Sequence, residues 1–171
     1  MILDATCSWK HDGRSKRWPE HATIRIDIRP EVRPDIVMDA CSLKFPDHFF
    51  DAIYYDPPHL FRKSDNIESL KRAKKLSGRK VKNTMFVLYG YWHNRDEWLS
   101  FLDRSLKEAL RCLKPDGIVY YKITESPGMK IGDLEGHGFN IVEKKTTNTK
   151  SKVGSKAKVH WLTMRPASVS I

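Results

Sequence analysis

The stretch "AIYYDPPHL" (residues 52–60) joins a short apolar run to one carboxylate and two prolines. Its β-branched and aromatic residues are typical of a strand, and proline cannot continue a strand's hydrogen-bond ladder. A strand that ends at Asp56 is therefore predicted. The acid and the prolines either terminate this strand and nothing more, or belong to a functional site, and the rest of the chain has to decide between these interpretations.

Six further apolar runs have the same character. They are "MILDA" (1–5), "TIRIDI" (23–28), "DIVMDA" (35–40), "GIVYYKI" (117–123), "FNIVEKK" (139–145) and "KVHWLTM" (158–164). Before the fifth strand lies a helical stripe formed by Trp98, Leu99, Leu102, Leu106, Leu110 and Leu113. Asn94 is the expected N-cap, and residues 114–117 are expected to stop the helix. A strand, a helix and a strand in this order predict a parallel crossover within an open α/β sheet.

The composition indicates a single domain that spans residues 1–171. No apolar run approaches the roughly 20 residues needed to cross a bilayer, and the N-terminus lacks the features of a signal peptide. Cys7, Cys41 and Cys112 are widely separated, which argues against a disulfide framework and against a zinc site. We therefore expect a cytoplasmic protein that holds no metal and contacts no membrane.

The net charge of +10 and the pI near 9.6 favour a polyanionic partner, although a merely soluble basic protein has the same composition. A basic insertion, residues 61–86, directly follows the prolines and carries nine basic side chains against two acidic ones. It is either an exposed helix with a flexible end or a loop that contacts substrate. In the second interpretation, its nucleic-acid-binding residues are Arg62, Lys63, Lys71, Arg72, Lys74 and Lys75.

Acidic residues lie at the ends of the first four predicted strands: Asp4, Asp27, Asp39 and Asp56. The ends of parallel strands line one crevice, and an acid about 20 residues after the first strand commonly binds ribose hydroxyls. Asp27 has this spacing from Asp4, and Asp39 would then lie near the adenine of the same ligand. Any one of these carboxylates is also compatible with a helix cap or a turn.

The motifs "ILDATC", "IRIDI", "MDACSLKFPDHFFDAIYYDPPH" and "ALRCLKPDGIVYYK" resemble those of class I S-adenosylmethionine-dependent methyltransferases that act on exocyclic amines of nucleic-acid bases. "DATC", "DPPHL", "LKPDG" and "KVHWLTM" together resemble small stand-alone methylases of phage-like genomes. The resemblance implies a Rossmann-like, seven-stranded, mostly parallel sheet whose last strand is antiparallel. It implies S-adenosylmethionine as cofactor, bound by Asp4, Ala5, Thr6, Asp27, Asp39, Ala40 and Cys41. The implied catalytic residues are Asp56, Pro57, Pro58 and His59.

Two features depart from the family pattern. The first motif has no glycine before Gly13, where the family has Gly-x-Gly for close approach of the backbone to the cofactor. The catalytic tetrapeptide ends in His59 instead of an aromatic residue. Candidates for stacking on a base, or for packing in the core, are Trp9, Trp18, Tyr91 and Trp92.

The sequence thus predicts a methyltransferase acting on adenine N6 in DNA, with cytosine N4 or an RNA base as alternatives. A nucleic-acid-binding protein that kept the fold and lost transfer activity is a second class. A dinucleotide-dependent oxidoreductase is disfavoured because no Gly-x-Gly-x-x-Gly turn is present. The chain has no separate target-recognition domain, so specificity is expected to come from the basic loops, a homodimer or a partner protein.

Overall fold

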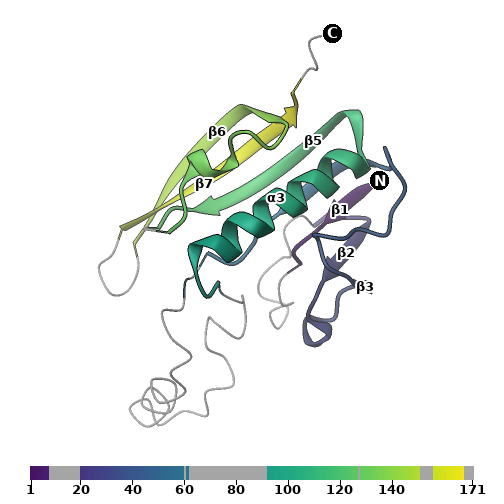
Figure 1. Ribbon diagram of the computed structural model, residues 1–171, viewed down its shortest axis with the longest axis horizontal. Helices are drawn as coiled ribbons and strands as arrows, with labels where there is room; N and C mark the ends of the chain where they lie inside the picture. The colour runs from purple at the N-terminus through teal and green to yellow at the C-terminus, as the bar shows by residue number, and fades with distance from the viewer. Residues whose placement is uncertain (8–19, 60, 62–91, 127, 151–155, 168–171) are drawn as a thin grey trace.

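The computed structural model describes residues 1–7, 20–59, 61, 92–126, 128–150 and 156–167 (Figure 1). Most of the basic insertion lies outside the described residues, together with its predicted nucleic-acid-binding side chains and with Trp9, Trp18 and Tyr91. The roles expected for those residues stay predictions.

The described residues form one seven-stranded sheet with the strand order β3-β2-β1-β4-β5-β7-β6. Its strands are β1 (Ile2–Asp4), β2 (Ile24–Asp27), β3 (Ile36–Val37), β4 (Phe50–Tyr55), β5 (Leu113–Thr124), β6 (Phe139–Lys150) and β7 (Lys156–Pro166). Neighbours among the first five strands pair in parallel, whereas β7 pairs antiparallel with both β5 and β6. The predicted α/β sheet, mostly parallel with an antiparallel last strand, is confirmed.

One long helix, α3 (Arg95–Cys112), lies over the sheet beside β5 (Figure 1). As predicted, Asn94 caps it: the Asn94 side chain accepts a hydrogen bond from Glu97 N at 2.8 Å. Trp98, Leu102 and Leu106 are fully buried. Two shorter turns of 3-10 helix, η1 (Pro30–Val32) and η2 (Ile131–Leu134), follow β2 and β5.

The prediction for the last two residues of the apolar stripe of α3, Leu110 and Leu113, is wrong. Leu110 is 38% exposed, and Leu113 is buried but belongs to β5. Ala109 and Cys112 continue the buried face instead, because they follow Leu102 and Leu106 at helical spacing while Leu110 lies about 100° away from Ala109. The helix stops at Cys112, before residues 114–117. Those residues form an irregularity in the β4–β5 pairing: Phe50 pairs with Leu113, but Ala52, two residues later, pairs with Ile118, so β5 has extra residues between the two pairs.

The position of β4 explains the apolar run that precedes Asp56. β4 lies between β1 and β5, and the residues from Ala52 to Tyr55 are all buried, so both faces of this strand are covered. Ile53 and Tyr55 are 0% exposed. Asp56 therefore leaves the sheet at its centre, beside the end of β1. No helix in the described ranges is long and apolar enough to span a membrane.

Candidate functional site

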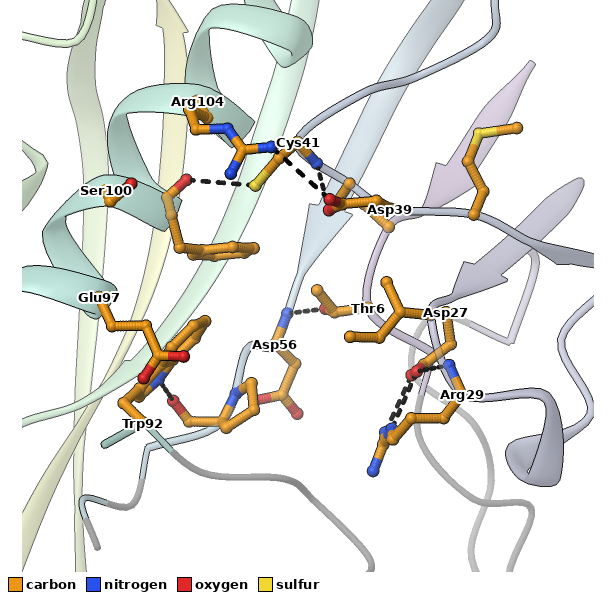
Figure 2. Close-up of a pocket in the computed structure, with 16 residues that line it drawn as sticks. Thr6, Asp27, Arg29, Asp39, Cys41, Asp56, Trp92, Glu97, Ser100 and Arg104 are labelled. Carbon is orange, nitrogen blue, oxygen red and sulfur yellow. Dashed lines mark hydrogen bonds and ion pairs between the residues drawn. The ribbon is translucent and has the colours of Figure 1, made fainter. Parts of the chain in front are cut away.

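A pocket of about 360 Å³ lies at the carboxyl ends of the parallel strands, between the ends of β1, β2 and β4 and the N-terminal half of α3 (Figure 2). The structure brings most of the predicted site residues together there. The predicted residues that line the pocket are Ala5, Thr6, Asp27, Asp39, Ala40, Cys41, Asp56 and Pro58. Asp4, Pro57 and His59 are adjacent in the chain but do not line it.

The turn after β1 connects the predicted cofactor motif to the predicted catalytic segment. Asp4 is 3% exposed, and its Oδ1 accepts a hydrogen bond from Thr6 N at 3.3 Å. Thr6 Oγ1 in turn accepts a hydrogen bond from Asp56 N at 2.7 Å (Figure 2). Cys7 N donates to Ile26 O at 3.0 Å, so the chain remains paired with β2 where the family has its glycine-rich turn. Asp4 thus shapes the turn, while Thr6 both lines the pocket and accepts a hydrogen bond from Asp56 N.

Asp27, at the end of β2, is held by Arg29. Asp27 Oδ1 accepts hydrogen bonds from Arg29 N and Nε, and Oδ2 accepts one from Nη2, each at 2.9 Å (Figure 2). A carboxylate oxygen has room for about two donors, so Oδ2, with one donor, keeps acceptor capacity. Arg29 also lines the pocket. Arg29 is not among the predicted site residues; its only signal in the sequence is a basic residue two positions after the acid.

Asp39 and Cys41 form the wall after β3. Asp39 Oδ1 accepts a hydrogen bond from Cys41 N at 2.8 Å, and its Oδ2 lies 3.7 Å from Arg104 Nη2 on α3. Burial, and then the charge of Asp39, raise the pKa of the Cys41 thiol to about 12. The thiol is therefore protonated at neutral pH and is a poor nucleophile. This argues against covalent catalysis by a cysteine in this pocket.

Asp56 is paired with Lys122, which is not among the predicted site residues. Lys122 Nζ donates to Asp56 Oδ2 at 2.6 Å, and the two side chains are 25% and 28% exposed. Lys122 lies on β5 and also sits over the Trp161 ring of β7, 5.2 Å from its centroid. The only sequence feature that could have indicated Lys122 as a site residue is its position as a charged side chain within the apolar run "GIVYYKI". The pair fixes the position of one carboxylate oxygen and leaves Oδ1 for another partner.

Aromatic side chains hold the segment that follows Asp56. Trp92 Nε1 donates to Pro58 O at 2.6 Å, and the Trp92 ring lies 4.9 Å from that of Phe101 on α3. Trp92 is therefore a structural support of the pocket wall. Burial lowers the pKa of His59, and the charge of Lys122 lowers it further against the opposing effect of Asp56. His59 is thus a neutral imidazole near pH 7.

Comparison with solved structures identifies the fold. A methyltransferase from Methanosarcina mazei is 14% identical and has a TM-score of 0.51; the alignment covers 98% of this chain and 92% of that one. A Burkholderia thailandensis 1,6-didemethyltoxoflavin-N1-methyltransferase, solved with S-adenosylhomocysteine, has 13% identity and a TM-score of 0.52, covering 98% and 71%. The chain has a methyltransferase-type Rossmann-like fold.

The methyltransferase-type fold alone does not fix the reaction. The [4+2]-cyclase SpnF is also similar, with 13% identity, a TM-score of 0.52, and coverage of 98% of this chain and 75% of that one. No protein-family model matches the chain, and no curated protein matches it either. The activity has to be argued from the side chains of the site.

Proposed function

We propose that this protein transfers a methyl group from S-adenosylmethionine to an exocyclic amine of a nucleic-acid base, with adenine N6 of DNA as the target. The observation that carries the proposal is the position of Asp56. It opens the Asp-Pro-Pro segment, whose prolines restrict the backbone, and lines the same pocket as Asp27, Asp39 and Thr6.

The pocket fits the proposed cofactor in size and in chemistry. A volume of about 360 Å³ is within the range of small-molecule sites, which extends from about 300 to 1,000 Å³. Asp27 has acceptor capacity for a ribose hydroxyl at Oδ2. Ile28, Met38 and Phe101 provide apolar surface for a flat heteroaromatic ring. Asp39 would lie beside that ring, and the carboxylates suit a ligand with a positively charged sulfur.

The proposed chemistry requires an activated nitrogen and no covalent enzyme intermediate. Bound S-adenosylmethionine supplies an electrophilic methyl carbon, whose bond to sulfur breaks as its bond to the base nitrogen forms. The amine of adenine is a weak nucleophile because its lone pair is delocalised into the ring. A hydrogen bond from the amine to Asp56 Oδ1 would draw the nitrogen toward a tetrahedral geometry and make the lone pair available.

The surrounding residues place that acceptor before the substrate arrives. Lys122 holds Asp56 Oδ2, and Thr6 Oγ1 holds Asp56 N. The Pro57 carbonyl is the second acceptor that we assign to the amine, and the fixed backbone of the prolines orients it. The nitrogen loses one proton in the reaction; this proton leaves through Asp56 Oδ1 to solvent. Neutral His59 would form one wall of the base pocket.

The decisive experiment is transfer of a radiolabelled methyl group to separate DNA, RNA and protein acceptors. Asp56→Ala should abolish transfer to DNA while cofactor affinity, measured by calorimetry, is largely retained. Asp116→Ala is the matched control, because Asp116 is an exposed acid at the start of β5, away from the pocket.

Three outcomes would redirect the proposal. Transfer only to RNA would change the acceptor and leave the role of Asp56 intact. Nucleic-acid binding without cofactor binding would favour a protein that kept the fold and lost activity. Near-normal transfer by Asp56→Ala would contradict the proposed mechanism.

A further inference from the structure

The hairpin formed by β6 and β7 extends past the rest of the sheet. The β5–β7 pairing ends at Thr124 and Val159, whereas the β6–β7 pairing continues through Asn148 and Lys158 to the last residues of the hairpin strands. Because β7 is antiparallel to β5, this extension lies at the carboxyl ends of the parallel strands. Figure 1 shows it reaching beyond the end of β5. The extension is therefore on the same edge of the sheet as the pocket.

The β6 strand is unusually exposed for part of a sheet. Every residue from Asn140 to Asn148 is exposed, although a half-buried strand normally buries alternate residues. β6 is also the last strand in the sheet order. Both faces and one edge of this strand are thus open within the part of the chain that the structure describes.

The exposed part of the hairpin carries unpaired cations on both faces. We call Lys144–Asn148 of β6 with the paired residues Lys158–Leu162 of β7 the basic ribbon. Lys144 pairs with Leu162 and Lys145 with Trp161, so these two consecutive lysines project to opposite faces. Lys158 is paired with Asn148. Lys144, Lys145 and Lys158 form no ion pair with any other described residue.

The shape and charge of the ribbon fit duplex DNA. A two-stranded β-ribbon enters the B-DNA major groove, which is about 12 Å wide, whereas the major groove of duplex RNA is too deep and narrow for side-chain reading. Lys158 lies where the hairpin is two-stranded. Lys144 and Lys145 lie beside the part of β7 that also pairs with β5, on opposite faces of the edge strand, where they could reach phosphates that flank the groove. Lysine on an exposed strand edge also prevents aggregation, and all three lysines are compatible with that role as well as with DNA contacts.

We propose that the basic ribbon docks into the major groove of duplex DNA and positions the target base at the neighbouring pocket. This inference rests on the proposed DNA acceptor and adds the surface that holds it. Thr146, Thr147 and Asn148 supply short polar side chains at the same part of the ribbon. The lysines would supply affinity through phosphate contacts, which are independent of sequence.

The test compares two triple variants that lose the same charge. The ribbon variant combines Lys144→Ala, Lys145→Ala and Lys158→Ala. The control combines Lys44→Ala, Lys107→Ala and Lys114→Ala, whose exposed or partly exposed lysines lie near the C-terminal half of α3 or the start of β5. Binding to a fluorescein-labelled duplex of about 20 base pairs is followed by anisotropy between about 50 and 200 mM salt. Single-stranded DNA and duplex RNA are measured in parallel.

The ribbon variant should bind duplex DNA at least about tenfold more weakly than wild type near 100 mM salt. Its log–log salt slope should be smaller in magnitude by up to about 0.9 for each lysine that contacts a phosphate. The control variant should match wild type in both quantities. A variant with Lys144→Arg, Lys145→Arg and Lys158→Arg should restore binding, because it keeps the charge. Far-UV circular dichroism verifies that all variants are folded, independently of cofactor binding.

Failure of this inference is distinguishable from failure of the proposed function. If the ribbon variant binds duplex DNA as tightly as wild type with the same salt slope, the ribbon does not dock DNA. The proposed methyl transfer is unaffected by this result, because the radiolabel assay tests it separately. If wild type prefers single-stranded DNA or duplex RNA, the groove-docking inference is also overturned. A wild-type protein that binds no nucleic acid overturns both proposals. If the wild-type protein does not bind the cofactor but the ribbon variant loses DNA binding, the docking inference is supported and the proposed methyl transfer is contradicted.

Discussion

Replacing Lys122 with methionine tests the ion pair at the centre of the site. Lys122→Met removes the ammonium that lies 2.6 Å from Asp56 Oδ2 but keeps an unbranched side chain over Trp161. Lys114→Met is the matched control, because Lys114 Nζ also lies 2.6 Å from a carboxylate oxygen, that of Asp51. The side chains of the control pair are 43% and 54% exposed, against 25% and 28% for Lys122 and Asp56.

The burial of the Lys122–Asp56 ion pair determines how much unfolding free energy Lys122→Met should lose. Removing one partner of a fully buried ion pair costs about 3–5 kcal/mol, since the other charge is left without compensation. Lys122 and Asp56 keep about a quarter of their exposure, so water compensates part of this loss. The cation–π contact with Trp161 contributes about 0.5–1 kcal/mol. We therefore expect Lys122→Met to lower the free energy of unfolding by about 2 kcal/mol, and Lys114→Met to lower it less.

Urea unfolding followed by circular dichroism gives these free energies by linear extrapolation. Methyl transfer at saturating cofactor should fall at least about tenfold in Lys122→Met, which corresponds to about 1.4 kcal/mol in the barrier. Lys122→Arg should recover much of the stability, since it restores the cation. The reasoning is refuted if Lys122→Met is no less stable than Lys114→Met and transfers methyl groups at the wild-type rate.

Three further predictions concern neighbouring residues. Asp27→Ala should weaken S-adenosylmethionine binding in calorimetry without unfolding the domain; unchanged affinity would remove Asp27 from the cofactor site. Trp92→Phe removes the donor to Pro58 O and should cost about 1 kcal/mol in urea unfolding while cofactor affinity stays the same; a stable variant with normal transfer would contradict the supporting role of this hydrogen bond. Burial lowers the pKa of His59 below its ordinary 6.5, so its contribution to stability is present above pH 6.5 and is lost as the pH falls toward the folded-state pKa. His59→Gln should flatten this part of the pH–stability profile, and an unchanged profile would show that another group titrates there.

The sequence was sufficient for the sheet and for the location of the site. The seven apolar runs became the seven strands, and acids at consecutive strand ends met at one pocket because parallel strands end on the same edge. Asp27, Asp39 and Asp56 were located in this way. Their functional roles stay predictions.

The partners of those acids could not be read from periodicity. Arg29 reaches Asp27 through a local turn, and Lys122 reaches Asp56 across two paired strands. Both contacts depend on side-chain direction and strand register, which the apolar pattern does not specify. The error at Leu110 has a similar origin: several leucines satisfied an approximate helical spacing, whereas the small side chains of Ala109 and Cys112 form the face that meets the sheet.

The distribution of the pocket residues along the chain has a consequence for how such a protein can diversify. All sixteen side chains that line the pocket come from residues 5 to 104, and none comes from β6 or β7. The exposed strand β6 can therefore accept substitutions while the lining of the pocket is preserved, whereas β7 has to keep Trp161 over Lys122 and its buried core residues. Sequence changes confined to β6 would alter the exposed surface beside the pocket and leave the Asp56–Lys122 pair unchanged.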